Sequence, residues 1–174
     1  MAKLEIITAP DPRLKATCKP VARVDAEVRR LMDDMLETMY AAPGIGLAAP
    51  QVGVAKRVIV VDASKDEEAR RPVCLANPTI VWRSDELASY EEGCLSVPDN
   101  FGEVERPARV RVRYLDREST ACEEEFDGLL ATCVQHEMDH LDGVLFIDHL
   151  SLLKRNIILR KLTKARRLKS AAAE

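Results

Sequence analysis

The sequence predicts an α+β fold in which antiparallel β-sheets wrap around a central helix, with a further helix toward the C-terminus. The expected helices and strands follow one another without the regular alternation that builds a parallel βαβ sheet. Residues 108–116 alternate apolar and arginine side chains, as in a strand with one buried face and one wet face. With 174 residues and 47% hydrophobic content, the chain has the size of one domain, which buries about two-thirds of its unfolded surface.

The first expected helix begins after Asp25, which can cap it, and ends near Ala41. Its apolar residues fall on one side, as in a helix that packs against a core, and they are Val28, Leu31, Met32, Met35, Leu36, Met39 and Tyr40. We interpret the methionines as core residues rather than as metal ligands. Three later segments have strand patterns, namely Arg57–Asp62, Thr79–Trp82 and Ala108–Asp116.

The motif His136-Glu137-Met138-Asp139-His140 says most about function. Two histidines four residues apart lie one turn apart on the same face of a helix, so both imidazoles can reach one metal ion. The glutamate between them can touch a metal-activated water without binding the ion, which is the arrangement of metal-assisted hydrolysis. The chain has only three histidines, so the alternative, a charged helix that places two of them here by chance, is the weaker interpretation.

The segment around this motif is expected to be a helix. Asp127-Gly128 can cap its start, Gly143 is placed to end it, and the apolar residues between them keep a helical spacing. These apolar residues are Leu129, Leu130, Cys133, Val134 and Leu141.

A third metal ligand is not found downstream of the motif. The extended pattern of many zinc proteases requires a histidine at position 146, where this chain has Phe146. No glutamate occurs between Glu137 and Glu174, and Asp148 and His149 follow at no known ligand spacing. The third ligand is therefore expected upstream, and cysteine is the residue type to consider.

The chain has five cysteines and no CxxC pair, which argues against a zinc ribbon and a complete disulfide framework. Cys94 is the favoured ligand, because Gly93 allows close backbone approach and Pro98 is expected to end regular pairing soon after it. Cys133 is the rival, but it lies on the motif helix itself, where its short side chain is poorly placed to reach an ion between the two imidazoles. We interpret Cys133 as a pocket-wall or core residue.

Three blocks of the sequence, in this order, resemble the signature motifs of peptide deformylases of the bacterial type. They are Gly44-Ile45-Gly46-Leu47-Ala48-Ala49-Pro50-Gln51, then Glu92-Gly93-Cys94-Leu95-Ser96, then Gln135-His136-Glu137-Met138-Asp139-His140. One block alone would be weak evidence, whereas all three in this order are specific, and the resemblance covers about the whole chain. It implies that residues 1–150 form the catalytic deformylase domain and that residues 151–174 are a basic helix and tail of the same domain.

The resemblance also implies a role for each matched residue. Cys94, His136 and His140 would bind one divalent metal ion, and Glu137 would act as general acid and base. The Gln51 side chain and the Leu95 backbone N–H would stabilise the developing oxyanion. Ile45 and Gly46 would pair their backbone with the substrate, and Ile45, Leu129 and Cys133 would line a pocket for its side chain. Without the other two motifs, a simple turn before the strand at 57–62 would be the favoured interpretation of Gln51.

The expected reaction is removal of the formyl group from N-formylmethionyl nascent peptides, with release of formate. The implied ion is Fe²⁺, with Zn²⁺, Ni²⁺ or Co²⁺ as substitutes. Bacterial members often carry an arginine just after the cysteine motif, where this chain has Asp99-Asn100-Phe101, so binding beyond the first substrate residue is open. A zinc endopeptidase, disfavoured by the missing downstream ligand, and a non-catalytic metal domain are the alternatives.

The C-terminal segment suggests a partner. Residues 151–173 contain no acidic residue, and eight cations lie there: Lys154, Arg155, Arg160, Lys161, Lys164, Arg166, Arg167 and Lys169. An apolar face is expected from Leu152, Leu153, Ile157, Ile158, Leu162 and Leu168, with the first part docked and the end projecting. A basic helix could bind ribosomes near the emerging chain, or it could be a solvated helix end whose cations suit the helix dipole.

Composition predicts a cytoplasmic enzyme. Residues 1–20 have no sustained apolar run of the kind found in signal peptides, and no segment is apolar enough to cross a membrane. A thiolate ligand suits a reducing compartment. We expect a monomer without membrane association.

Overall fold

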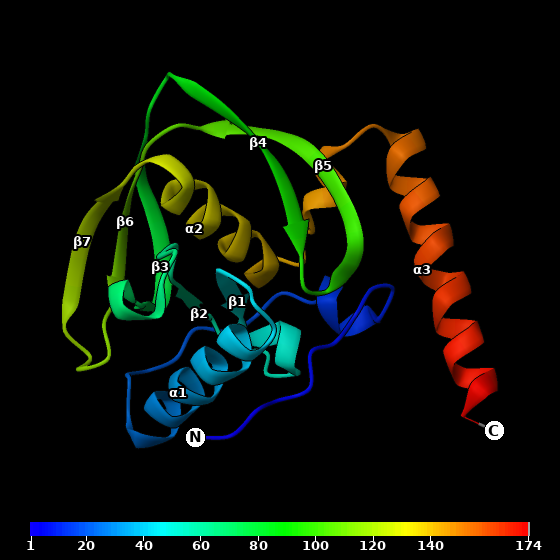
Figure 1. Ribbon diagram of the computed structural model, residues 1–174. Coiled ribbons are helices and arrows are strands. Elements are labelled where there is room, and N and C mark those ends of the chain that lie inside the picture. Colours follow the sequence, from blue (N-terminus) through cyan, green and yellow to red (C-terminus); the bar gives the residue numbers. More distant parts are fainter. Residues whose placement is uncertain (174) are drawn as a thin grey trace.

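The fold is α+β, as predicted, and the computed structural model describes residues 1–173 (Figure 1). Five strands form an antiparallel sheet in the order β1-β2-β3-β6-β7, and two strands form the β4-β5 hairpin. The strands are β1 (Gly46–Ala48), β2 (Val58–Val61), β3 (Val73–Arg83), β4 (Leu87–Cys94), β5 (Val97–Pro107), β6 (Val110–Leu115) and β7 (Ala121–Phe126). The helices are α1 (Ala26–Ala41), α2 (Gly128–Leu141) and α3 (Leu152–Ala172).

Helix α2 is the central element, and both sheets pack around it (Figure 1). On the side of the five-stranded sheet, apolar residues of β2, β3 and β6 meet Ala131, Val134 and Leu141 of α2 in one buried cluster. Asp127 stands at the N-cap as expected, although its side chain makes no capping hydrogen bond. Ten of the 14 residues of α2 are buried, and they include both histidines and Glu137. The chemistry-bearing face of this helix is therefore withdrawn from bulk water.

Helix α1 confirms the interpretation of its methionines. The Asp25 carboxylate accepts a hydrogen bond of 2.9 Å from the Val28 backbone N–H, which satisfies a free donor of the first turn. Met32, Met35 and Met39 are fully buried against β1 and β2. They are core residues.

The strands predicted at 57–62 and 108–116 are present as β2 and β6. All four residues of β2 are buried, and Val110, Val112 and Tyr114 of β6 face the core. The strand predicted at 79–82 is the end of the longer β3. The short β1, the β4-β5 hairpin and the edge strand β7 were not predicted.

The expectation that Pro98 ends regular pairing after Cys94 was wrong. Cys94 pairs with Val97, a register shift separates this pair from Gly93 opposite Phe101, and the pairing continues to Leu87 opposite Pro107. Pro98 lies in the irregular first part of β5, between Val97 opposite Cys94 and Phe101 opposite Gly93, and a bulge of this kind tolerates proline.

The docking predicted for the C-terminal helix was partly wrong. Helix α3 lies along one side of the molecule (Figure 1), and Ile158 and Leu162 pack into a core cluster with Phe146. Leu152 and Leu153, which were expected to dock, are each 71% exposed, and Leu168 is exposed as well. Apolar contact is made by the middle of the helix, where Ile158 and Leu162 join this cluster, whereas the first turn contributes the Arg155–Asp148 ion pair at 2.8 Å. Glu174, the last residue of the predicted tail, lies outside the described residues.

Within the described residues, none of the helices combines the length and the apolar character that a membrane span needs.

Candidate active site

Cys94, His136 and His140 come together at the centre of the molecule. Potential ligand atoms of the three residues lie within 4.8 Å of one another, and the Cys94 Sγ to His140 Nε2 distance is 3.4 Å. Two ligands of a tetrahedral ion with ordinary Zn–S and Zn–N bond lengths are separated by about 3.6 Å. A hairpin end and one face of α2 thus place a thiol and two imidazoles at distances that suit a single cation. The rival Cys133 is not part of this group.

A buried carboxylate orients the first histidine. Glu92 Oε1 lies 2.8 Å from His136 Nδ1, which leaves Nε2 as the free ring nitrogen. Burial lowers the pKa of His136, but its hydrogen bonds with Cys94 and Glu92 outweigh burial, and the net shift is upward. Burial lowers the pKa of His140. A carboxylate behind a ligating imidazole fixes the orientation of the ring and strengthens it as a ligand.

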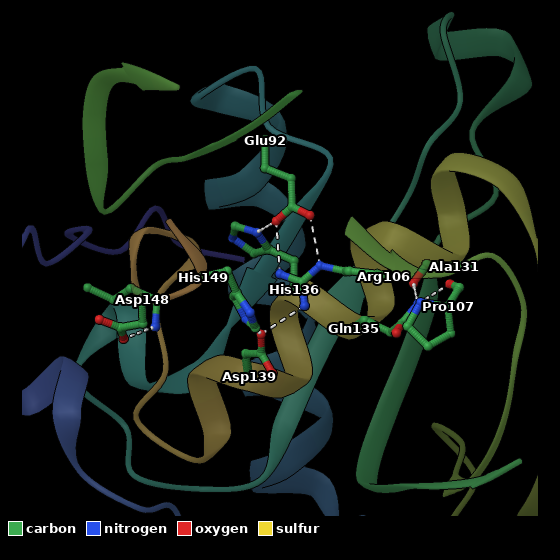
Figure 2. Close-up of polar contacts among 10 residues, drawn as sticks. Glu92, Arg106, Pro107, Ala131, Gln135, His136, Asp139, Asp148 and His149 are labelled. Carbon is green, nitrogen blue, oxygen red and sulfur yellow. Dashed lines mark hydrogen bonds and ion pairs between the residues drawn. The ribbon is translucent and has the colours of Figure 1, made fainter. Parts of the chain in front are cut away.

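Glu92 is held in turn by a buried arginine (Figure 2). Arg106 donates to Glu92 from Nε at 2.7 Å and from Nη2 at 2.9 Å, and both side chains are nearly inaccessible to water. Burial raises the pKa of Glu92, but hydrogen bonds from Arg106 and His136 outweigh it and bring the pKa to about 2. This carboxylate is therefore ionised at neutral pH.

The ion-pair network continues to the surface. Arg106 Nη1 lies 2.9 Å from Asp139 Oδ2, which also accepts from His149 Nε2 at 2.8 Å (Figure 2). Asp139 is thus the outward-facing partner on the motif helix, whereas His136 faces the thiol. The sequence analysis assigns no role to Glu92, Arg106, Asp139 or His149. Glu92 and Asp139 lie inside the quoted motifs, but no sequence pattern points to Arg106 as their partner.

Gln51 is buried beside the cysteine. Its Oε1 accepts from the Ala48 N–H at 2.8 Å, so Nε2 is the donor end, 3.0 Å from Ser96 Oγ and 3.5 Å from Cys94 Sγ. Gln51 also lies in the turn considered for it, a single 3₁₀ turn at Ala49–Val52 that follows β1. Because the turn aims the amide N–H₂ at the cysteine, the two interpretations of Gln51 are compatible.

Glu137 lies in the same pocket. It is 4% exposed, and its Oε2 has no hydrogen-bond partner within the described residues. Burial raises the pKa of Glu137 to about 7. An unpartnered carboxylate in a buried site is costly, and such groups are retained where chemistry uses them.

The pocket that contains these residues has a volume of about 440 Å³. Ile45 and Gly46 before and in β1, Gly93 and Leu95 around Cys94, and the side chains of Gln51, His136 and Glu137 all line it. A Cβ at Gly46 would lie 2.5 Å from Glu137 Oε1 and 2.8 Å from Cys133 Sγ, so only glycine lets β1 pass this close to α2.

A second, smaller cavity of about 80 Å³ opens beside the motif helix. Ile45, Leu129 and Cys133 line it, together with Tyr90, Thr132 and the base of the site. The Cys133 thiol lies 3.3 Å from the Ile45 carbonyl oxygen, and burial raises its pKa well above the usual value. Cys133 is therefore a neutral wall residue at neutral pH.

Comparisons with known proteins agree with this geometry. The polypeptide deformylase family model matches residues 3–156. The chain belongs to the polypeptide deformylase family. It is 63% identical to a peptide deformylase of Methylocella silvestris over 94% of this chain and 85% of the relative, and 60% identical to one of Phenylobacterium zucineum over 94% and 97%.

Solved structures support the same conclusion about this family member. Peptide deformylase from Ehrlichia chaffeensis in complex with actinonin is 44% identical, with a TM-score of 0.91 over 96% of this chain and 99% of that chain. The chain is thus an enzyme, a peptide deformylase. Its family consists of metalloenzymes, and a thiol with two imidazoles is a donor set that suits a divalent transition metal.

Proposed function

We propose that this enzyme removes the formyl group from the N-terminal formylmethionine of newly made polypeptides, with Cys94, His136 and His140 as ligands of one divalent cation. The supporting observation is that these three side chains converge, and that two of them, Cys94 and His136, line the same pocket as the Glu137 carboxylate. When bound, the cation supplies a Lewis acid that acidifies water and polarises the formyl carbonyl. Fe²⁺ is the proposed native ion on family resemblance, and Zn²⁺, Ni²⁺ or Co²⁺ can substitute because all suit a Cys/His donor set.

Glu137 moves the proton in the proposed reaction. Its carboxylate takes a proton from the attacking water, whose oxygen forms a bond to the formyl carbon. The same carboxyl group then returns the proton to the peptide nitrogen as the C–N bond breaks, which releases formate and a free N-terminus. The orphaned Oε2 of Glu137 supports this role, because no group among residues 1–173 forms a hydrogen bond with it.

The oxyanion that forms at the formyl oxygen needs hydrogen-bond donors. The Gln51 Nε2 donor and the Leu95 backbone N–H are proposed to supply them as a preorganised oxyanion hole. The orientation of Gln51 supports this assignment, because Ala48 engages its oxygen and leaves the N–H₂ group toward Cys94. Leu95 lines the same pocket.

The substrate is proposed to lie as an added strand along β1. The backbone of Ile45 and Gly46 lines the pocket and can pair with an extended peptide. The methionine side chain would enter the cavity between Ile45, Leu129 and Cys133, where its flexible thioether can fit an irregular apolar wall.

A direct assay tests this function. Protein purified without oxygen is expected to release formate from formyl-Met peptides, to act poorly on acetyl-Met peptides and to leave internal peptide bonds intact. Formyl-Asp peptides are expected to be poor substrates, because an apolar cavity does not solvate a carboxylate. Elemental analysis of the same sample identifies the metal. Internal cleavage of unblocked peptides without formate release would instead favour the endopeptidase alternative.

The basic helix is proposed to bring this cytoplasmic enzyme to ribosomes. Seven of its eight cations are exposed, and among these eight only Arg155 forms an ion pair within the described residues, with Asp148 at 2.8 Å. Ribosomal RNA presents phosphates, so a cationic helix would raise the local concentration of nascent chains.

Weak ribosome binding that falls with added salt is expected, and deletion of residues 160–174 should abolish it while short formyl peptides are still hydrolysed. Because that deletion also removes the buried Leu162, a matched variant, Arg160→Gln/Lys164→Gln/Arg167→Gln, keeps the docked side chains and removes only charge. Co-sedimentation with ribosomes at two salt concentrations measures the effect. Binding that is unchanged in the deletion would identify the tail as an ordinary solvated helix end.

A further inference from the structure

An aromatic ring and a carboxylate form the outer rim of the catalytic pocket. The pocket extends from His136 and Glu137 to Asp99 and Phe101 near the start of β5. Phe101 is 64% exposed, although large aromatic side chains are usually mostly buried. Its ring rests on Gly93, where a Cβ would lie 2.7 Å from Phe101 Cε1. The β4-β5 pairing therefore holds this ring at the rim and leaves part of it facing water.

Asp99 is held in an unusual backbone conformation. Its φ is +62°, a left-handed conformation that aspartate and asparagine tolerate better than most residues. On either side of Asp99, Asn100 Nδ2 donates to the Pro98 carbonyl oxygen at 2.8 Å, and this hydrogen bond stabilises the local backbone. Asp99 is exposed, and no other side chain in the described part of the chain forms an ion pair or hydrogen bond with its carboxylate.

The outer rim of the pocket carries a negative charge. Among the described residues that line the pocket there is no lysine or arginine, and the charged group at its outer end is Asp99. A peptide in strand conformation advances about 3.3 Å per residue. Because Cys94, His136, Asp99 and Phe101 line one pocket, an extended peptide with its formyl group at the Cys94 end and its chain continuing through this pocket would bring its first residues after methionine toward Asp99 and Phe101.

We infer that Asp99 and Phe101 determine substrate preference beyond methionine, favouring a lysine or arginine at one of the next two positions and disfavouring aspartate or glutamate. This inference rests on the proposed deformylase function. The carboxylate attracts the cationic head of the substrate side chain, and the exposed ring face offers a cation–π contact and an apolar surface for the aliphatic stem. An acidic side chain at the same place meets a like charge and no compensating donor.

The test compares kcat/KM for the series formyl-Met-X-Ala and formyl-Met-Ala-X, with X as Lys, Arg, Gln or Glu, at low ionic strength. Lysine is expected to exceed glutamate by about 10-fold at one of the two positions, as for a partly exposed ion pair with a cation–π contact. The ratio should shrink toward one at about 1 M salt, where the Debye length is only about 3 Å. Glutamine is the uncharged reference.

Two variants separate the contributions. Asp99→Asn keeps the left-handed backbone accessible and is expected to remove most of the lysine-over-glutamate ratio. Phe101→Ala is expected to reduce the lysine-over-glutamine and arginine-over-glutamine ratios by about 2–5-fold through loss of the ring contact. Glu103→Gln is the matched control, because it removes an exposed carboxylate from the same strand outside the pocket lining and should leave every ratio unchanged.

Equal rates for lysine and glutamate peptides at both positions, with formyl-Met-Ala-Ala hydrolysed normally, would overturn the inference alone. A preference that Asp99→Asn retains in full would do the same. No hydrolysis of any formyl peptide would overturn the proposed function together with the inference built on it.

Discussion

Replacement of Glu137 by alanine is expected to lower the turnover number by about 10²–10⁴-fold, the usual contribution of general acid–base catalysis. The fold and the metal content should change little, because Glu137 is not one of the three converging ligand residues and its Oε2 has no partner among the described residues. Loss of an unpartnered buried carboxylate removes a desolvation penalty rather than a stabilising contact. The effect should therefore be confined to the chemical step.

Glu137→Gln is the matched control for this result. Glutamine keeps the volume and polarity of the side chain but cannot accept the proton from water, so it should be nearly as slow as alanine. Initial rates on a formyl-Met peptide, elemental analysis and thermal unfolding of the same samples measure catalysis, metal content and fold. A Glu137→Ala enzyme with normal metal content and near wild-type turnover would remove Glu137 from the mechanism.

The shared face of the two histidines was predictable because their spacing is local. Two histidines four residues apart share a helix face whatever the rest of the fold does, so His136 and His140 needed only a reliable helix. Cys94 comes from a distant hairpin and could be favoured over Cys133 only by the reach of a short side chain and by the motif around it. The structure places Cys94, and not Cys133, with the two imidazoles.

The β4-β5 hairpin was missed because its inward side is not uniformly apolar. Glu92 and Arg106 are inward residues of β4 and β5, and each is buried by pairing with the other. A pattern search expects alternating apolar residues and treats such charges as exposed. Edge strand β7 was missed for a related reason, since Glu123, Glu124 and Glu125 give it the charge that protects an exposed sheet edge.

The docking of α3 shows the limit of reading a helix face from sequence. The six apolar residues of the predicted face are a property of the segment, but which of them are buried depends on where the domain lies. Ile158 and Leu162 contact the cluster around Phe146, whereas Leu152 and Leu168 do not. The tertiary packing of the domain, and not the local sequence pattern, determines which of these residues are buried.

Replacement of Arg106 by methionine is expected to destabilise the protein by about 3–5 kcal/mol, the usual consequence of removing one partner of a buried ion pair. The Glu92 side chain is 5% exposed and would keep its charge without the two donors that now compensate it. His136 would also lose a firmly placed acceptor at Nδ1, so weaker metal retention is expected. Chemical denaturation and metal content of the purified variant measure the two effects.

The stability lost in Arg106→Met is expected to depend on pH. The pKa of Glu92 is lowered from 4.5 to about 2 in the folded protein, so its ionised form stabilises the fold above about pH 4.5 and the contribution disappears as pH falls toward 2. The deficit of Arg106→Met relative to wild type should therefore be largest near neutral pH and shrink in acid. A deficit below about 1 kcal/mol at neutral pH would mean that water or His136 alone compensates Glu92.

Two further variants separate charge from geometry. Arg106→Lys keeps the charge but cannot form the bidentate contact, so it should fall between wild type and Arg106→Met. Arg106→Met/Glu92→Gln removes both charges, and it should recover much of the stability lost in the single variant because no uncompensated carboxylate remains buried. Metal retention should not recover to the same extent, since a neutral amide behind His136 cannot strengthen the imidazole as a carboxylate does. Recovery of stability without recovery of metal binding would therefore assign the Glu92–Arg106 pair chiefly to the support of His136 rather than to the fold.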